Sequence, residues 1–255
     1  ASGKGGVGKS TVTANLAVAL AQQGKRVGIL DADVWGYSIP HLFGVRRAPI
    51  AIKGLMLPVE AHGVSLMSVG FFVADEEPVV WRGPMLHKAL EQFLTDVFWD
   101  EPDFLLIDMP PGTGDIHLTL MQTVPVTGVV VVTTPQDVAL ADAKKGIAMF
   151  GQAQIKVPII GLVENMSYFT PAELPDNKYY IFGEGGGKKL AKMANTVLLG
   201  QVPLVQSVRE GGDTTISMPG LRHIPAGEDL EIDFADEDLH FFGSGTAVSD
   251  AGLPK

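Results

Sequence analysis

Residues 3–10, which read Gly-Lys-Gly-Gly-Val-Gly-Lys-Ser, decide the fold of this chain. They match G-x-x-x-x-G-K-[ST], the pattern of the phosphate-binding loop. The glycines allow tight turns, so that successive backbone N–H groups can converge on phosphate oxygens. Lys9 is expected to reach the β- and γ-phosphates of a nucleotide, and the Ser10 hydroxyl to bind Mg²⁺. A glycine-rich turn that only caps a helix is the alternative, but the complete pattern is specific for nucleotide phosphates.

The residues around this loop predict a parallel α/β sheet. Residues 10–20 follow as a helix whose N-terminal dipole favours an anion, and Gly24 ends that helix. Residues 26–30 then form a short apolar strand, which completes a βαβ pattern. A phosphate-binding loop also needs a strand that leads into it, and only two residues precede Gly3. We therefore expect that upstream sequence, at least most of one strand, is missing from this chain.

Further apolar strands recur along the chain. We expect them at 63–69, 104–107, 128–134, 159–163 and 197–200, and helices at 84–99, 138–151 and 188–194. The rhythm stops beyond residue 213, where 230–234 alternates like a half-exposed strand inside an acidic stretch. The predicted fold class is a three-layer α/β sandwich with a mostly parallel sheet and helices on both faces. Residues 1–212 form this domain, and 213–255 form an acidic, Gly-rich tail with a short β element.

Composition argues against several classes of protein. The 255 residues are 46% hydrophobic and can bury one large core, yet no run of about 18 apolar residues and no signal peptide is visible. We therefore expect a cytoplasmic protein with no membrane partner. A net charge of −10 argues against nucleic acid as a partner. The chain has no cysteine, which excludes disulfides and Cys-ligated metals, and its six histidines show no metal-ligand spacing, so we expect them in surface or packing roles.

Three aspartates follow the carboxyl ends of predicted strands, where ligands bind in parallel sheets. Asp108 ends the strand 104–107, the place from which such enzymes hold the shell of a Mg²⁺ ion. Asp31 and Asp33 follow a neighbouring strand. One of their carboxylates can position the attacking water and the other can support the metal shell. The alternative is that all three only cap the loops that follow.

Two further residues are candidates for contact with a nucleotide. Gly112 could give its backbone N–H to the γ-phosphate and so sense hydrolysis. Asn165 ends a later strand, and its amide offers the donor and acceptor that match the edge of adenine. A turn asparagine is an equally good interpretation. Lys4 is an extra lysine that the general pattern does not require, and an ordinary surface lysine is the simplest interpretation of it.

Taken together, these residues resemble the SIMIBI class of P-loop proteins with a deviant Walker A loop. That class includes the MinD and ParA ATPases and the nitrogenase iron protein. Four segments, at 30–40, 81–85, 106–115 and 163–167, are similar to the Mrp/ApbC-type iron–sulfur cluster carriers. The resemblance covers roughly residues 1–212. It implies a slow, Mg²⁺-dependent ATPase that acts as a nucleotide-sandwich homodimer in iron–sulfur cluster assembly or transfer, with scaffold or apo-target proteins as partners.

The resemblance also implies roles for individual residues. Lys4 matches the lysine that reaches across the homodimer to the partner's nucleotide, and Asp33 matches the aspartate that orients water. With Lys9, these are the predicted catalytic residues. The predicted nucleotide-binding residues are Gly3, Lys4, Gly5, Gly6, Val7, Gly8, Lys9, Ser10, Thr11, Gly112 and Asn165. The predicted magnesium site is Ser10, with Asp31 and Asp108 reaching the ion through its bound water.

One departure from the resemblance concerns the cluster. The similar proteins commonly carry a C-x-x-C where this chain has residues 168–176, so no cluster can be held here by thiolates. Glu173 and Asp176 would be poor substitutes, because such clusters favour sulfur ligands. Two other functions stay open. One is a MinD/ParA-like switch that positions partner proteins without a cluster, and the other is an ATP-dependent ligase or kinase similar to dethiobiotin synthase.

Overall fold

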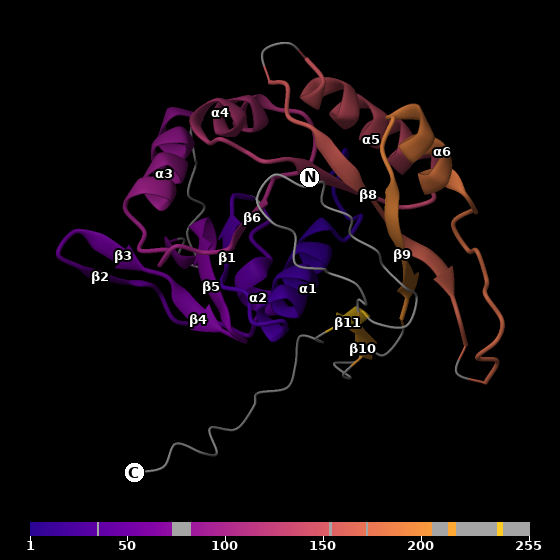
Figure 1. Cartoon of the computed structure of the whole chain (residues 1–255), viewed down its shortest axis with the longest axis horizontal. Helices are drawn as coiled ribbons and strands as arrows, with labels where there is room; N and C mark the ends of the chain where they lie inside the picture. The colour runs from indigo at the N-terminus through magenta and orange to yellow at the C-terminus, as the bar shows by residue number, and fades with distance from the viewer. Residues whose placement is uncertain are drawn as a thin grey trace.

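The computed structural model describes residues 1–34, 36–72, 83–152, 155–171, 173–205, 214–217 and 239–241. Its strands form two main sheets (Figure 1). In the first, the order is β4 (Val59–Ala61), β5 (Val64–Ser68), β1 (Val27–Asp31) and β6 (Phe104–Asp108), and only β4 is antiparallel to its neighbour. The second contains β7 (Val129–Thr133), β8 (Ile159–Phe169) and β9 (Leu198–Leu204), which are all parallel.

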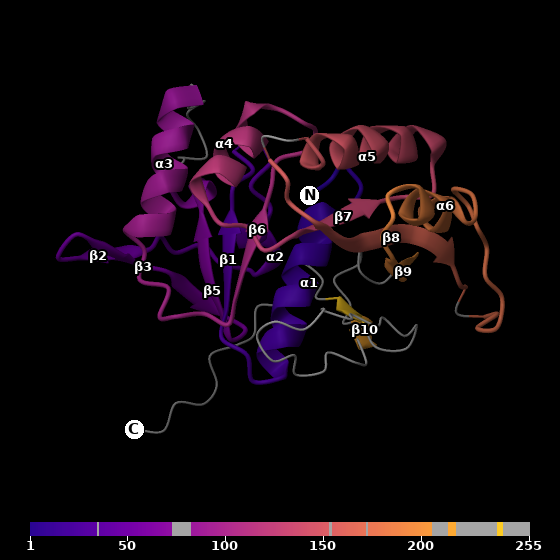
Figure 2. The same ribbon diagram turned by 45° about the horizontal axis from the view of Figure 1, so that its top comes forward.

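Helices cover both faces of these strands. Figure 2 shows α4 and α5 on one side and α1 on the other. The helices are α1 (Lys9–Gln22), α2 (Ile39–Leu42), α3 (Gly83–Thr95), α4 (Asp115–Thr123), α5 (Asp137–Phe150) and α6 (Gly186–Met193), with a 3₁₀ turn at Val69–Phe72.

Alternation along β1 explains the layers. Ile29 packs into a core with Ala17 of α1, whereas its neighbour Leu30 packs into a second core with Leu90 of α3 and Leu120 of α4. Successive residues of a strand face opposite sides of a sheet, so a fully apolar strand needs helices on both faces. This arrangement confirms the predicted three-layer α/β fold.

Ala1 and Ser2 lie between the two sheets. Val132 of β7 donates its N–H to the Ala1 carbonyl at 2.9 Å, and the Ala1 nitrogen donates to the Val130 carbonyl at 2.9 Å. On the other side, the Gly112 N–H donates to the Ser2 carbonyl at 3.0 Å. Helix α1 contacts strands of both sheets, β6 and β7 among them. The phosphate-binding loop therefore begins at the junction of the two sheets.

Three predicted boundaries were wrong. Helix α3 ends at Thr95, because residue Val97 pairs with Met56 in an extended conformation. Strand β8 continues past 163 to Phe169, where it bonds both ways with Tyr179. Strand β9 likewise continues past residue 200. In β8, polar residues interrupt the apolar pattern although the strand itself does not stop there.

The remaining strands are short. A hairpin of β2 (Ile50–Ile52) and β3 (Leu55–Leu57) projects from the body in Figure 1. β10 (Thr214–Ser217) pairs with β11 (Leu239–Phe241) within the predicted tail. The expected strand at 230–234 and the first two residues of segment 81–85 lie outside the described residues. Within the described part of the chain, no helix combines the length and the apolar character needed to cross a membrane.

Candidate nucleotide-binding site

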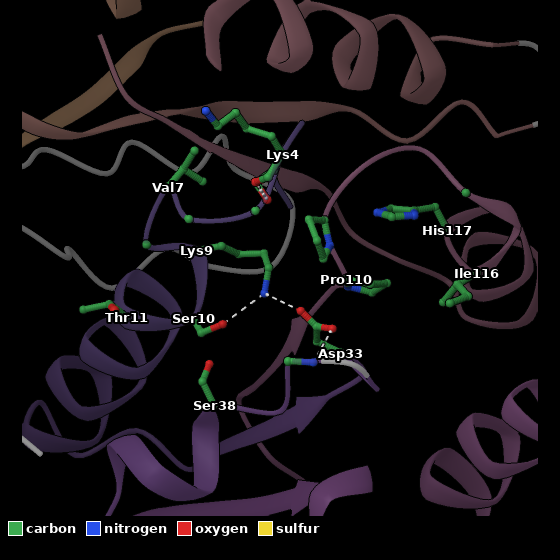
Figure 3. Close-up of a pocket in the computed structure, with 17 residues that line it drawn as sticks. Lys4, Val7, Lys9, Ser10, Thr11, Asp33, Ser38, Pro110, Ile116 and His117 are labelled. Carbon is green, nitrogen blue, oxygen red and sulfur yellow. Dashed lines mark hydrogen bonds and ion pairs between the residues drawn. The ribbon is translucent and has the colours of Figure 1, made fainter. Parts of the chain in front are cut away.

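The phosphate-binding loop opens onto a cavity of about 580 Å³ (Figure 3). Gly6 and Gly8 have φ angles of +79° and +81°, a conformation that favours glycine. Gly8 precedes α1 and no side chain caps that helix, so its first N–H groups are available to an anion. The cavity is lined by the loop residues Lys4 to Thr11 together with Ser2, Asp33, Gly36, Ser38, Pro110, Pro111, Gly114, Ile116 and His117.

Two glycines of the loop are needed for close packing. A Cβ on Gly3 would overlap the backbone of Asp142 and Ala143 in α5, and a Cβ on Gly8 would overlap the side-chain amide of Asn165. Gly3 does not line the cavity, so its part is to set the loop directly against α5. A larger residue at either position would displace the loop.

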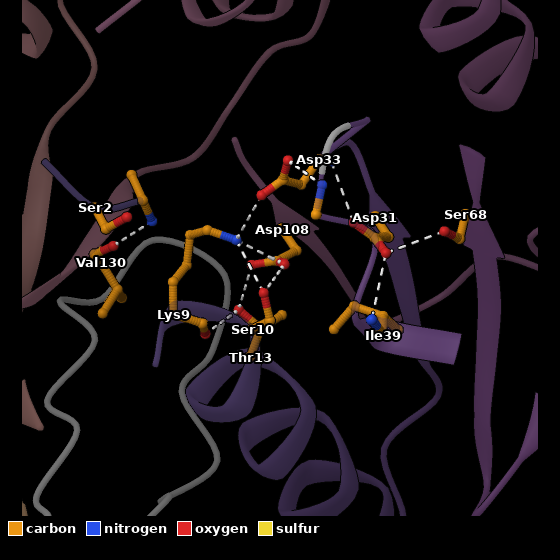
Figure 4. Close-up of polar contacts among 12 residues, drawn as sticks. Ser2, Lys9, Ser10, Thr13, Asp31, Asp33, Ile39, Ser68, Asp108 and Val130 are labelled. Atoms are coloured by element: carbon orange, nitrogen blue, oxygen red, sulfur yellow. Dashed lines mark hydrogen bonds and ion pairs between the residues drawn. The ribbon is translucent and has the colours of Figure 1, made fainter. Parts of the chain in front are cut away.

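Lys9 lies at the centre of a cluster of polar groups (Figure 4). Its Nζ lies 2.8 Å from Asp108 Oδ2, 3.0 Å from Ser10 Oγ and 4.0 Å from Asp33 Oδ2. Asp108, which is only 1% exposed, also accepts hydrogen bonds from Ser10 at 2.6 Å and Thr13 at 3.1 Å. The cluster therefore brings together side chains from the loop and from the ends of two strands.

Strand register explains why the carboxylates meet. Ser68, Asp31 and Asp108 are the last residues of β5, β1 and β6, and each is paired in register with its neighbour. Because parallel strands end at the same edge, three polar side chains are brought side by side. The Asp31 carboxylate accepts hydrogen bonds from the Ser68 hydroxyl at 3.0 Å and the Asp33 and Ile39 N–H groups at 3.2 and 3.4 Å. These partners lie at the end of β5, in the loop after β1 and at the start of α2, and Lys9 and Ser10 are not among them.

Burial has a strong effect on Asp31. The residue is 0% exposed and lies beside the Asp108 carboxylate. Removal from water, and then repulsion by Asp108, raise the pKa of Asp31 to about 7, although its hydrogen bonds act in the opposite direction. The Asp31 carboxyl therefore titrates near neutral pH, far above the usual range of an aspartate.

Asp33 faces the cavity from the loop that follows β1. Its Oδ1 accepts the Gly36 N–H at 3.0 Å, while Oδ2 is the oxygen directed toward Lys9 (Figure 3). One carboxylate oxygen is thus fixed by the backbone, whereas the other has only the 4.0 Å contact with Lys9 among the described residues. This second oxygen is available to a water molecule if Lys9 turns away.

The donor set suits a magnesium ion. Ser10 offers a hydroxyl and Asp108 a carboxylate, both oxygen ligands, and the described residues contain no cluster of three or more His, Cys, Asp or Glu residues able to hold a metal. Mg²⁺ usually takes one or two protein oxygens and completes its shell with phosphate and water. The residues present therefore fit Mg²⁺ bound together with a nucleotide.

The other predicted residues lie around this cluster in different ways. The Lys4 side chain points away from Lys9, and its ammonium has no hydrogen-bond or ion-pair partner among the described residues (Figure 3). Thr11 lines the cavity, whereas Gly112 has φ +92° and gives its N–H to Ser2. Asn165 does not line the cavity, and its amide donates to the Val7 carbonyl at 2.9 Å.

Glu164 and Asn165, neighbours on β8, anchor different elements. Asn165 contacts the phosphate-binding loop, as described above. Glu164 is 0% exposed and accepts hydrogen bonds from the Gly187 N–H at the start of α6 at 2.6 Å, from Gln201 at 2.6 Å and from Ser167 at 2.9 Å. One strand therefore holds the loop and α6 together.

His117 lines the cavity although sequence reasoning assigned the histidines to surface or packing roles. It is the third residue of α4 and is only 1% exposed. Its ring projects toward the phosphate-binding loop in Figure 3, and neither ring nitrogen makes a hydrogen bond. The only sequence signal is its place just after the glycine-rich loop at 109–114.

Comparison with known proteins places these features in a family. A family model described as ParA, NUBPL iron-transfer P-loop NTPase, matches residues 1–225. The iron–sulfur cluster carrier protein of Synechocystis is 52% identical over 217 residues, which are 83% of this chain and 61% of that protein. The chain thus spans about 60% of the length of the curated relatives that it matches first.

Solved structures agree on the fold. A nucleotide-binding protein from Archaeoglobus fulgidus, in complex with ADP, is 42% identical, with a TM-score of 0.69 over 80% of each chain. The septum site-determining protein MinD of Pyrococcus horikoshii, complexed with Mg-ADP, has a TM-score of 0.56 over 82% of this chain and 81% of its own. At 21% identity, the second comparison shows the fold alone.

Proposed function

Since the chain belongs to the ParA-type family of NUBPL iron-transfer P-loop NTPases, we propose that it binds ATP with Mg²⁺ and hydrolyses it slowly as a homodimer. The observation that carries this proposal is the cluster of Lys9, Ser10, Asp33 and Asp108 at the loop. An ammonium, a hydroxyl and two carboxylates at the start of a helix are the groups that phosphoryl transfer requires.

Each residue of the cluster has a distinct part in this proposal. A bound triphosphate competes with Asp108 for Lys9, and Lys9 turns from the carboxylates to the β- and γ-phosphates. Ser10 would hold a Mg²⁺ ion directly and Asp108 would hold the water around it, and the ion would supply positive charge to neutralise the phosphates. When Lys9 has turned, Asp33 Oδ2 is free to orient the attacking water, because Oδ1 stays fixed by Gly36.

Three other residues complete the proposed site. Gly112 contacts the γ-phosphate through its N–H once it leaves Ser2, and Asn165 contacts the adenine once its amide leaves the Val7 carbonyl. Lys4, which points away from its own cluster, serves the nucleotide of a second copy. The ammonium of Lys4 supports this assignment, since a lysine with no partner among the described residues of its own subunit is available to another.

We propose further that ATP turnover serves the assembly or transfer of iron–sulfur clusters. The support is the name that the curated relatives carry, iron–sulfur cluster carrier protein. The iron–sulfur cluster would be a cargo. These 255 residues supply no thiolate to it, because they contain no cysteine. Maturation of an apo-ferredoxin in the presence and absence of this protein and ATP tests this part. Equal maturation rates would refute the iron–sulfur role and leave the ATPase unaffected.

The ATPase itself is tested with two variants and one control. Lys9→Ala should abolish measurable ATP binding in calorimetry, whereas Asp33→Asn should bind ATP within about twofold of wild type and lose about a hundredfold in kcat, as expected for loss of a catalytic base. Lys53→Ala, on the exposed turn between β2 and β3, is the control and should change neither quantity. Wild-type kcat in Asp33→Asn would contradict the proposed role of that carboxylate.

A further inference from the structure

His117 is a buried polar side chain that the proposed site does not use. Neither Nδ1 nor Nε2 has a hydrogen-bond partner, and the residue is 1% exposed. Burial lowers the pKa of His117, so the ring is neutral at pH 7 and carries one N–H donor and one acceptor. A buried donor without an acceptor is unfavourable, so an unpaired group of this kind in a native protein calls for an explanation.

Two acceptors beside the ring belong to the loop between β6 and α4. The backbone carbonyls of Pro110 and Gly114 lie close enough to the ring to act on its pKa, although neither reaches hydrogen-bond geometry. On its other side, the ring meets the edge of Phe150 in α5, with centroids 6.4 Å apart and planes at 61°. The ring is thus held between α5 and the loop at 109–114, and the loop offers it two acceptors.

The same loop contains the hydrogen bond between Gly112 and Ser2, which binding of a γ-phosphate would break. The Gly112 N–H, which in the proposed function contacts the γ-phosphate, is donated to the Ser2 carbonyl at 3.0 Å. It cannot serve both acceptors at full strength, so contact with phosphate requires the loop to move away from Ser2. Pro110 and Pro111 have no N–H and restrict φ, so they move as a stiff unit. Movement at Gly112 therefore also shifts the Pro110 carbonyl beside His117.

We propose that His117 is a positioning residue for the ATP-bound state, an inference that rests on the proposed ATPase function. When the Gly112 N–H passes from Ser2 to the γ-phosphate, the His117 imidazole N–H donates to the carbonyl of Pro110 or Gly114. The loop loses the hydrogen bond between Gly112 and Ser2 and gains one from His117, and the unpaired ring nitrogen thereby obtains an acceptor. His117 thus favours the position of the loop in which Gly112 faces the phosphate, without touching the nucleotide itself.

Two variants separate positioning from structural support. His117→Leu removes the donor at similar volume, whereas His117→Gln keeps an N–H donor. We expect His117→Leu to fold with an unchanged urea midpoint, to bind ADP within about twofold of wild type, and to lose about tenfold in kcat, the value of one hydrogen bond. His117→Gln should recover most of kcat. His87→Leu, at an exposed position of α3, is the matched control and should equal wild type.

A spectroscopic measurement reports on the bond itself. In ¹⁵N-histidine-labelled protein, the His117 imidazole signals should shift when a non-hydrolysable ATP analogue binds and should stay unchanged with ADP. Identical signals with both nucleotides, or wild-type kcat in His117→Leu, would overturn the positioning role while the ATPase stands. Parallel losses of ADP affinity, kcat and urea stability in His117→Leu would also overturn it, in favour of simple packing. A wild-type protein that binds the analogue without hydrolysing ATP would refute the proposed turnover. In that case the shift of the imidazole signals alone would test whether His117 forms the proposed bond.

Discussion

Asp31 connects the edge of the sheet to the loop that carries Asp33, and its protonation should affect stability. Its pKa is about 7 in the folded chain and 3.8 in the unfolded chain. Between these values the folded state binds more protons than the unfolded state, so the free energy of unfolding falls as pH rises. The stabilising contribution is complete below about pH 4 and is lost as pH rises through 7.

Asp31→Asn should therefore flatten part of the pH profile. The asparagine is uncharged throughout, so the variant should gain ~3 kcal/mol relative to wild type between pH 5 and pH 8. Urea denaturation of the nucleotide-free proteins at pH 5, 6, 7 and 8 measures this difference. Parallel profiles for the two proteins would show that Asp31 ionises without cost in the folded state.

At the scale of residues, the sequence predicted the position of a side chain only where neighbouring residues determine it. Asp31 and Asp108 could be placed at one edge because each ends an apolar strand of a parallel sheet. The burial of His117 could not be predicted, because it depends on Phe150 in a distant helix. The bond between Asn165 and Val7 likewise depends on how β8 meets the loop, which no sequence spacing encodes.

At the scale of elements, the contact between the phosphate-binding loop and α5 leaves no space for a side chain at Gly3. Gly3→Ala places a methyl group against the backbone of Asp142 and Ala143, so either the loop or the helix must shift. We expect a loss of ~1–3 kcal/mol in the free energy of unfolding, as for other overpacked sites, and weaker ATP binding. Gly5→Ala is the control for stability, since its added Cβ would meet only Pro111 at 4.0 Å. Equal urea midpoints for the two variants would contradict this packing argument.

Element boundaries show a similar division between local and tertiary effects. Helix α1 and strands β1, β5, β6 and β7 were predicted well, since apolar runs and glycine ends mark them in the sequence. The extension of β8 was missed because Glu164 interrupts its apolar run. That carboxylate accepts hydrogen bonds from Gly187 and Gln201, which come much later in the sequence. These bonds allow a charged residue to be buried within the strand, and its neighbours in the sequence do not reveal them.

At the scale of the whole molecule, the central prediction concerns the proposed homodimer. If Lys4 completes the site of its partner, neither Lys4→Ala nor Asp33→Asn alone should turn over ATP at more than about a tenth of the wild-type rate. In an equimolar mixture, half of the dimers contain both variants. Each of these has one site with an intact Asp33 and an intact partner Lys4. The mixture should therefore recover about a quarter of the wild-type rate in a steady-state ATPase assay.

The mixture distinguishes the two positions that Lys4 could occupy. If Lys4 serves its own nucleotide, every site in the mixture lacks one essential group and no activity returns. A mixture of Lys9→Ala and Asp33→Asn is the control. Both of these residues belong to the same site in the proposal, so this second mixture should remain inactive.

Strand β8 imposes a constraint on how this chain can vary. Glu164 and Asn165 are adjacent, so they face opposite sides of the sheet, one toward α6 and the other toward the phosphate-binding loop. Inserting or deleting a single residue between 159 and 163 would exchange those two sides wherever no β-bulge absorbed the change. The carboxylate would then meet the Val7 carbonyl, and the amide would meet the start of α6. Length changes in this lineage should accordingly accumulate in the turns on either side of β8, and the strand itself should keep its residue count.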